Sequence, residues 1–298
     1  MKQLIINPIG GLANRMRALA AGISLARDLG VDYSVVWMKN RELAASFDAI
    51  FAPSDMLDGK ISYPSSISYE LLYSPPRKRN LFVTALTLRR YGIAFLDGVG
   101  PWGEILKEKD SHINVRRLFE AAFSSARQCM IQGGTDLYPY DEALYRMLYV
   151  PSEEIAGRVA ERVGQLGDRS YGIHIRRTDN AVSIQHSPDD AFIAEISRLS
   201  ESVPEAKFYL ATDSEDVKRK FVGIFGPRIV CSPFVADRNS VEGMKEAAVE
   251  LFTLSRTNAI LGSYYSSFSE AAAMIGNVRL TQIDVAAALW RGSVSGKW

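Results

Sequence analysis

The feature that most constrains the fold is a regular alternation of short apolar runs and amphipathic stretches, clearest in the second half of the chain. Short apolar runs are typical of buried strands, and apolar residues spaced by three and four are typical of helices. Strands that alternate with helices predict a parallel, doubly wound sheet. The expected strands are 171–177, 207–211, 228–231, 258–261 and 278–281, and the expected helices are 152–166, 188–201, 214–225, 241–255 and 267–275.

The start of the chain carries a unit of the same kind. Apolar runs at 4–7 and 31–37 predict two strands, and the stretch 13–29, which ends before Gly30, predicts the helix between them. Frequent Pro and Gly leave the elements between about 53 and 135 unassigned.

Two domains are expected, because 298 residues are enough for two α/β domains of ordinary size. Val150 is followed by Pro, Ser and two Glu residues, a pattern that indicates a boundary and the start of a helix. We therefore predict two Rossmann-like α/β domains, 1–150 and 151–298, with a cleft between them.

Composition excludes several classes of function. The chain has 35 Lys and Arg residues against 34 Asp and Glu residues, so no overall field favours nucleic acid. Cys129 and Cys231 lie far apart in the sequence, and they and the three histidines match neither a disulfide framework nor a zinc-like spacing. We expect a soluble, cytoplasmic protein, because no long apolar stretch is present and the apolar start is too short for a signal peptide.

A basic segment at 75–91 holds five cationic residues and no acid. They are Arg77, Lys78, Arg79, Arg89 and Arg90. A solvated basic face is the favoured interpretation, and the alternative is contact with an anionic acceptor or with a membrane surface.

Polar residues follow the first predicted strand, where a turn opens a helix. Gly10, Gly11, Asn14 and Arg15 lie there, and the backbone N–H groups of such a helix start suit a phosphate or a sugar hydroxyl. The glycine spacing of a dinucleotide fingerprint is absent. The alternative is a tight turn that packs the helix on the sheet.

The segment 174–179, His-Ile-Arg-Arg-Thr-Asp, closes the first strand of the second domain. Strand alternation predicts His174 and Arg176 on one side of the strand and Arg177 on the other. An arginine at a strand end is costly to bury without an anion, which makes a phosphate its natural partner. The alternatives are a hydrogen-bonded core histidine and a structural ion pair.

Two later strands also end in polar residues. Asp213 or Ser214 is expected to cap the helix that follows, with ligand binding as the alternative role. Ser267 and Glu270 have the spacing of a capping box, and a helix start crowded with hydroxyls, Ser266 included, also suits a diphosphate.

Glu250 falls at the border of the apolar face of the predicted helix 241–255. One interpretation is an exposed helix acid. The other is a carboxylate that accepts two N–H bonds from the edge of a guanine, whose adjacent donors adenine does not offer.

Taken together, these residues resemble the GDP-fucose-dependent fucosyltransferase superfamily of core α1,6-, rhizobial nodulation and protein O-fucosyltransferases. The resemblance is carried, in the expected order, by the segments 10–15, 174–179, 210–213, 250–255 and 266–269. It implies a metal-independent GT-B fold in which the C-terminal domain holds most of the sugar nucleotide and the N-terminal domain lies on the acceptor side.

The resemblance also implies roles for single residues. His174 and Glu250 would read guanine, Arg176 would bind the β-phosphate, and Ser266 and Ser267 would bind the diphosphate. Asp213 joins this donor-binding set. From the N-terminal domain, Gly11, Asn14 and Arg15 would close the cleft over the donor.

The general base stays open. In the core α1,6 enzymes, Arg-Arg-Thr-Asp is followed by Lys and shortly by a Glu base, whereas residues 180–184 of this chain contain no acid. Asp179 is the expected catalytic acid or base beside Arg176, and His186, Asp189 and an acid of the N-terminal domain are further candidates. Asp189 and Asp190 resemble a metal-binding pair, but acids are favoured at a helix start in any case.

We therefore expect an inverting transferase that moves fucose from GDP-fucose to a glycan hydroxyl without a metal or other cofactor. Arg176 and the amides of Ser266 and Ser267 would stabilise the charge on the leaving GDP. The alternatives are a non-catalytic GDP-sugar or glycan-binding protein, a transferase for another GDP-linked sugar, and a nicotinamide oxidoreductase.

Overall fold

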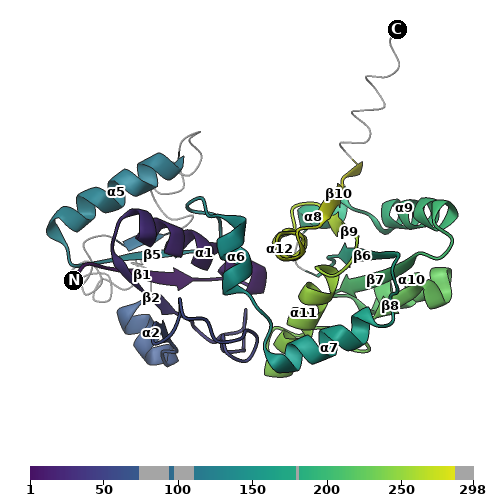
Figure 1. Ribbon diagram of the computed structural model, residues 1–298, viewed down its shortest axis with the longest axis horizontal. Coiled ribbons are helices and arrows are strands. Elements are labelled where there is room, and N and C mark those ends of the chain that lie inside the picture. The colour runs from purple at the N-terminus through teal and green to yellow at the C-terminus, as the bar shows by residue number, and fades with distance from the viewer. Residues whose placement is uncertain (74–93, 97–110, 179–180, 286–298) are drawn as a thin grey trace, which may run out of the picture. The chain divides into compact units, whose positions relative to one another are not determined.

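The structure is a computed structural model and describes residues 1–73, 94–96, 111–178 and 181–285. The chain divides into two compact units, Met1–Val150 and Pro151–Trp298. Each unit is built around its own parallel sheet (Figure 1). The basic segment 75–91 and Asp179 lie outside the described residues.

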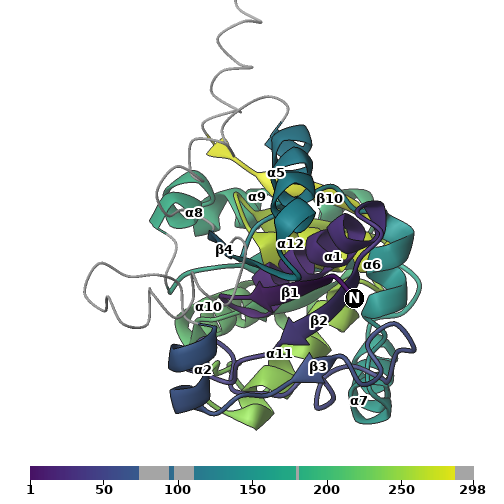
Figure 2. The same ribbon diagram turned by 90° about the vertical axis from the view of Figure 1, so that its left-hand side faces the viewer.

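The first unit has a parallel sheet with the strand order β3-β2-β1-β5-β4. Helices α1 and α2 lie on opposite sides of its central strands (Figure 2). Its elements are β1 (Gln3–Pro8), α1 (Leu12–Asp28), β2 (Asp32–Val36), β3 (Ile61–Ser62), α2 (Ser66–Leu72), β4 (Ala94–Leu96), α5 (Ser111–Ser125), β5 (Gln128–Gly133) and α6 (Glu142–Leu148).

Two glycines place helix α1 against this sheet. Gly10 has φ +86°, a left-handed conformation that lets the chain turn sharply between β1 and α1. Gly22 lies in α1 directly over Ile6, and a Cβ atom there would come within 2.7 Å of the Ile6 Cγ2 atom. A larger residue at position 22 would therefore push the helix off the sheet.

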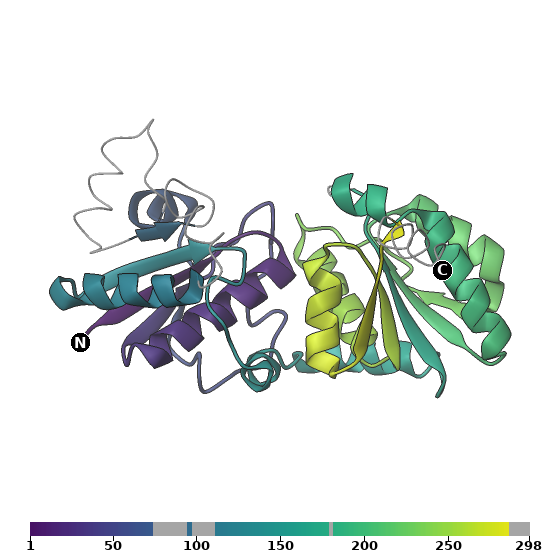
Figure 3. The ribbon, with the colours of Figure 1, turned by 90° about the horizontal axis from the view of Figure 1, so that it is seen from above.

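The second unit has a parallel sheet with the strand order β10-β9-β6-β7-β8. Helix α12 covers one side of this sheet, and α9 and α10 cover the other (Figure 3). Its elements are α7 (Glu153–Val163), β6 (Ser170–Ile175), α8 (Ala181–His186), α9 (Asp189–Ser202), β7 (Lys207–Thr212), α10 (Glu215–Phe225), the 3₁₀ turn η1 (Gly226–Arg228), β8 (Ile229–Cys231), α11 (Val241–Leu254), β9 (Ala259–Ser263), α12 (Ser267–Gly276) and β10 (Arg279–Ile283).

The two faces of this second sheet are packed differently. The α9 and α10 face is apolar, and its core includes Ile175, Phe192, Phe208 and Phe221, all fully buried. On the other face, Gly262 lies against Ser269 of α12, and a Cβ atom at Gly262 would approach the Ser269 Oγ atom to 2.5 Å. This close approach brings a helix with polar residues directly onto the sheet.

The predicted α/β fold with two parallel, doubly wound sheets is confirmed. Every strand and helix expected in the second half is present, with ends shifted by a few residues. The unassigned middle of the first unit contains β3, α2, β4, α5 and β5. Among the described residues, no helix is both long and apolar enough to cross a membrane.

Candidate functional site

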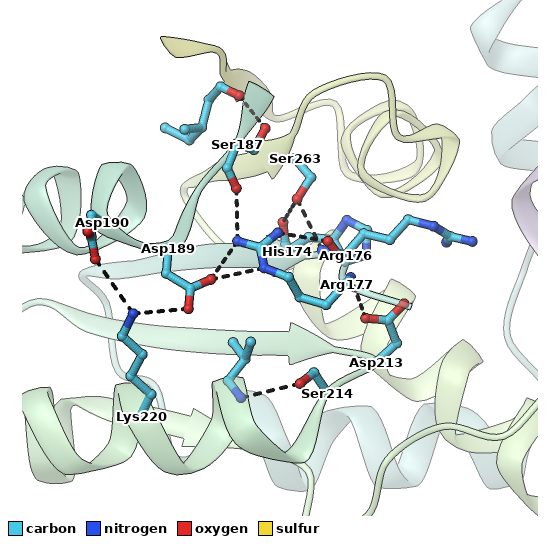
Figure 4. Close-up of polar contacts among 12 residues, drawn as sticks. His174, Arg176, Arg177, Ser187, Asp189, Asp190, Asp213, Ser214, Lys220 and Ser263 are labelled. Atoms are coloured by element: carbon cyan, nitrogen blue, oxygen red, sulfur yellow. Dashed lines mark hydrogen bonds and ion pairs between the residues drawn. The ribbon is translucent and has the colours of Figure 1, made fainter. Parts of the chain in front are cut away.

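Polar side chains gather at the carboxyl ends of β6, β7 and β9, three adjacent strands of the second sheet (Figure 4). His174 is near the end of β6, Asp213 directly follows β7, and Ser263 ends β9. Ligands of doubly wound sheets bind beyond this edge of the sheet. The structure therefore brings these residues together where a ligand is expected.

His174 is buried and held as a neutral ring. Its Nδ1 atom lies 2.7 Å from the Ser269 Oγ atom and 3.4 Å from the Ser266 Oγ atom, and its ring packs on Phe268 at 4.8 Å. Burial, helped by the charge of Arg176, lowers the pKa of His174 to about 4. When the serine hydroxyls donate to Nδ1, the ring proton lies on Nε2, and this nitrogen is a hydrogen-bond donor.

Asp213 holds the loop that follows β6. One carboxylate oxygen accepts the backbone N–H of Arg177 at 2.7 Å, and the other accepts the Thr178 hydroxyl at 2.6 Å and the Thr178 N–H at 3.3 Å. The helix cap is supplied by Ser214, whose Oγ atom accepts the Val217 N–H of α10 at 3.4 Å. Asp213 thus shapes the loop that carries the two arginines.

The two arginines have different surroundings. Arg177 donates to Asp189 through two nitrogens, at 2.9 and 2.6 Å, and to the Ser187 carbonyl at 2.8 Å. The backbone of Arg176 is held by the Ser263 Oγ atom at 3.1 Å, and its side chain points away from Asp189 (Figure 4). The predicted strand ended at Arg177, but β6 ends at Ile175 because these hydrogen bonds replace strand pairing.

Asp189 begins α9, as expected for an acid at a helix start. Burial opposes its ionisation, but hydrogen bonds from Arg177 and from Lys220 at 3.1 Å outweigh that effect and lower its pKa. Asp190 is exposed and lies 3.6 Å from Lys220. The described residues contain no group of three or more His, Cys, Asp or Glu side chains arranged to hold a metal ion.

The predicted capping box of Ser267 and Glu270 is wrong. The N-cap of α12 is Ser266, and its hydroxyl makes no capping hydrogen bond because it is directed at His174. Ser267 is the first residue of the helix. Ser266 is buried, and Ser267 is partly exposed beside it.

Glu250 is buried, so its interpretation as an exposed helix acid is wrong. Its Oε1 atom has no hydrogen-bond partner among the residues that the structure describes. Burial raises the pKa of Glu250 to about 8 against the attraction of Lys218 and Arg162, and the charges of Glu246 and Asp213 raise it further. A buried carboxylate oxygen without a partner is costly, so a ligand that donates a hydrogen bond to it would remove that cost.

Sequence reasoning missed the cations that approach Glu250. Lys218 is buried on α10 and donates to the carbonyl of Ser232 at 3.1 Å. Arg162 of α7 bonds to Glu246 of α11 at 3.4 Å, and α7 and α11 lie side by side (Figure 1). The only sequence signal was a lysine at an apolar position of α10, one residue after Val217 and three before Phe221.

In the first unit, Arg15 is turned inward. It is fully buried, its Nε atom donates to the Gly10 carbonyl at 2.8 Å, and a second nitrogen donates to the Asn40 Oδ1 atom at 3.0 Å. Its guanidinium also lies 5.4 Å from the centre of the Trp37 ring. Burial lowers its pKa to about 10, so it stays charged at neutral pH. These contacts give Arg15 a structural function in the turn.

The glycine turn already holds a carboxylate. The Gly10 N–H donates to the Glu42 Oε2 atom at 3.1 Å, and the Glu42 backbone N–H donates to the Asn40 Oδ1 atom at 2.9 Å. Gly11 is the N-cap of α1, and the Asn14 Oδ1 atom accepts a hydrogen bond from Arg17 at 3.0 Å. The Gly10 N–H group therefore already binds a carboxylate of the protein itself.

No protein-family model and no curated protein sequence matches the chain. Solved structures match it over nearly its whole length. NodZ α-1,6-fucosyltransferase soaked with GDP-fucose is 17% identical, with a TM-score of 0.54 over 92% of each chain. POFUT1 in complex with GDP is 12% identical, with a TM-score of 0.56 over 95% of this chain and 98% of its own. A mutant of Arabidopsis thaliana FUT1 in complex with GDP is 12% identical, with a TM-score of 0.58 over 94% of this chain and 70% of its own.

These likenesses establish the fold. The chain has the GT-B architecture of fucosyltransferases, with two parallel α/β sheets in two units. The resemblance that the sequence motifs carry is thus matched by the structure at the level of the fold.

The buried carboxyl of Glu250 predicts a pH-dependent cost to stability. A free glutamic acid ionises near pH 4.5, whereas Glu250 in the folded protein does so near pH 8. The wild type should therefore lose stability relative to Glu250→Gln as the pH rises from 4.5 to 8, with no further change above 8. By pH 9 we expect the variant to be more stable by roughly 2–5 kcal/mol in urea denaturation. Glu242→Gln, an exposed change in the same helix, is the control, and an equal effect of both substitutions would contradict the assignment.

Proposed function

We propose that the protein is an inverting glycosyltransferase that moves L-fucose from GDP-fucose to a hydroxyl of a glycan. The observation that carries the proposal is the partnerless Glu250 oxygen, buried in a unit that has the fold of GDP-binding fucosyltransferases. Fucose itself is supported by the match to NodZ soaked with GDP-fucose. Another GDP-linked sugar would use the same nucleotide contacts.

Glu250 and His174 supply what guanine recognition requires. A carboxylate accepts two hydrogen bonds side by side, which fits the N1–H and 2-amino donors of guanine, and adenine offers no such pair. A neutral His174 with its proton on Nε2 donates to a carbonyl such as guanine O6. His174, a donor that stays neutral near pH 7, and Glu250, a buried acceptor, would together select guanine over adenine.

The loop after β6 and the start of α12 supply the diphosphate site. Asp213 and Ser263 fix the backbone of this loop, so the backbone that carries Arg176 is ordered before a ligand binds. The N-terminus of α12, next to Ser266 and Ser267, adds backbone N–H groups and a favourable helix dipole. Together these groups would stabilise the negative charge on the departing GDP.

In the reaction, the acceptor oxygen attacks the anomeric carbon while the bond from that carbon to the β-phosphate oxygen breaks. The leaving GDP takes the electron pair, and the acceptor gives up a proton. Metal independence is part of the proposal, because an arginine and a helix terminus can neutralise the leaving group. The first unit would supply the acceptor side, and the low cysteine content is compatible with a cytoplasmic location.

Arg176→Ala should lower turnover of GDP-fucose by about 10²- to 10³-fold, because a preorganised donor to the developing charge is lost. Folding should persist, which thermal melting can check. Arg219→Ala, an exposed arginine on α10, is the matched control. Activity of Arg176→Ala within a few fold of the wild type would remove this residue from the mechanism.

The proposed role of Glu250 predicts that the site prefers GDP to ADP and that the affinity for GDP depends on pH. Only the ionised carboxylate accepts both guanine N–H bonds, so GDP affinity should rise from pH 6 to about pH 8 and then level off. Glu250→Gln leaves one donor unpaired and should weaken GDP binding by roughly tenfold to a hundredfold, with a smaller preference for GDP over ADP. Titration calorimetry with both nucleotides measures this. An unchanged GDP/ADP ratio would exclude Glu250 from base recognition.

Transfer should persist in EDTA, because the proposed site neutralises the diphosphate without a cation. Mass spectrometry of GDP-fucose incubated with an acceptor library, with and without EDTA, provides the measurement. Loss of activity in EDTA with recovery on adding Mg²⁺ or Mn²⁺ would contradict it. GDP binding without any turnover would instead identify a non-catalytic GDP-sugar-binding protein.

A further inference from the structure

A histidine–aspartate pair lies at the same sheet edge as the proposed donor site. His186 is the last residue of α8, and its Nδ1 atom lies 3.0 Å from the Oδ1 atom of Asp284, which directly follows β10. The His186 ring stacks on Tyr264 at 4.5 Å with an angle of 15° between the planes. The two side chains are 29% and 19% exposed, so solvent reaches the pair although neither residue is free to swing.

The surrounding backbone fixes the position of this pair. The Ser187 hydroxyl donates to the Ile283 carbonyl and accepts the Tyr264 N–H at 2.7 Å. Arg177 donates to the Ser187 carbonyl at 2.8 Å. Ser187 thus already joins α8 to β10, and the histidine–aspartate pair is not needed for that connection.

These contacts place His186 beside the groups proposed to bind the diphosphate. Tyr264, on which the ring stacks, precedes Ser266 by two residues, and Ser187 binds the side chain of the arginine next to Arg176. His186 therefore belongs to the edge where the bond to GDP would break.

Asp284 sets the tautomer of the ring. A carboxylate only accepts hydrogen bonds, so Nδ1 carries the proton and Nε2 carries a lone pair. Within the described part of the chain, no group bonds to Nε2. A histidine whose Nδ1–H is held by an aspartate is the arrangement that makes Nε2 a general base, since the aspartate stabilises the imidazolium that forms.

The competing acid near this loop is already engaged. Asp189 is paired with both Arg177 and Lys220, and its pKa is lowered, so it is a weak base. Asp190 points to solvent and to Lys220. The charged groups around His186 are thus Asp284 directly and Arg177 through Ser187.

We propose that His186 is the general base of the transfer reaction and that Asp284 is its positioning residue. This inference rests on the proposed function. As the acceptor oxygen forms its bond to the anomeric carbon, Nε2 removes the hydroxyl proton. The bond from the anomeric carbon to the β-phosphate oxygen breaks, and GDP leaves with the electron pair. The proton remains on the imidazolium, beside the Asp284 carboxylate, until it passes to solvent.

The test compares two nucleophiles on GDP-fucose, so no identified acceptor is needed. Water must lose a proton when it attacks, whereas azide has none to lose. His186→Gln should slow GDP release in water by about 10²- to 10⁴-fold, while GDP release with azide stays within a few fold of the wild type. The GDP dissociation constant, measured by calorimetry, should not change. His112→Gln, an exposed histidine on α5, is the matched control.

Asp284→Asn provides a second variant that preserves shape. The amide can donate to Nδ1 and place the ring proton on Nε2, so the reaction with water should fall about as far as in His186→Gln, again with azide spared. If His186→Gln no longer binds GDP or no longer shows a melting transition, the rates of Asp284→Asn with water and with azide test the proposal instead. A merely structural pair would slow the reactions with water and azide equally, and that result would overturn the proposal.

Different results would overturn the proposed transferase activity and the proposed general base. If the wild type binds GDP but releases none from GDP-fucose with water, azide or an acceptor library, the proposed transferase is overturned, and the proposed base with it. The other result is that the wild type is active while His186→Gln and Asp284→Asn hydrolyse GDP-fucose at nearly the wild-type rate. That result overturns only the assignment of the base.

Discussion

The site of the second unit depends on the hydrogen bonds that two carboxylates make to the loop after β6. Asp213 holds this loop with three hydrogen bonds, two of them from backbone N–H groups, and Asp189 holds the guanidinium of Arg177. Because hydrogen bonds to charged groups are stronger than neutral ones, they determine the loop conformation although strand pairing ends at Ile175. One arginine is thereby committed to structure and its neighbour is presented at the sheet edge.

The same unit contains a buried group, Glu250, whose burial is energetically unfavourable. Glu250 has a buried oxygen without a partner, and its pKa is raised to about 8. His174 differs, because the Ser269 hydroxyl lies 2.7 Å from its buried Nδ1 atom and burial keeps the ring neutral. The hydrogen-bonded Nδ1 of His174 holds its ring in place, and the unpartnered Glu250 oxygen favours a ligand that donates to a carboxylate.

Most of the fold could be predicted from the sequence, because the apolar periodicity of strands and helices is a local property. The details of the site could not, because they depend on distant partners. The capping box predicted at Ser267 is absent because the N-cap is Ser266, whose hydroxyl is directed at His174, 92 residues earlier in the chain. Which arginine pairs with an acid depends on Asp189, 12 residues away. The buried surroundings of Glu250 include the charges of Lys218 and Arg162, which come from two other helices.

The Glu42 carboxylate at the Gly10 turn gives the first unit a preference by charge. A helix start normally attracts anions, but here a side chain of the protein already neutralises the Gly10 N–H. A phosphate or carboxylate that approached this turn would meet a like charge and would have to displace it. A neutral sugar hydroxyl can donate to Glu42 without that penalty. At this turn, the Glu42 charge therefore favours an uncharged hydroxyl over a phosphate.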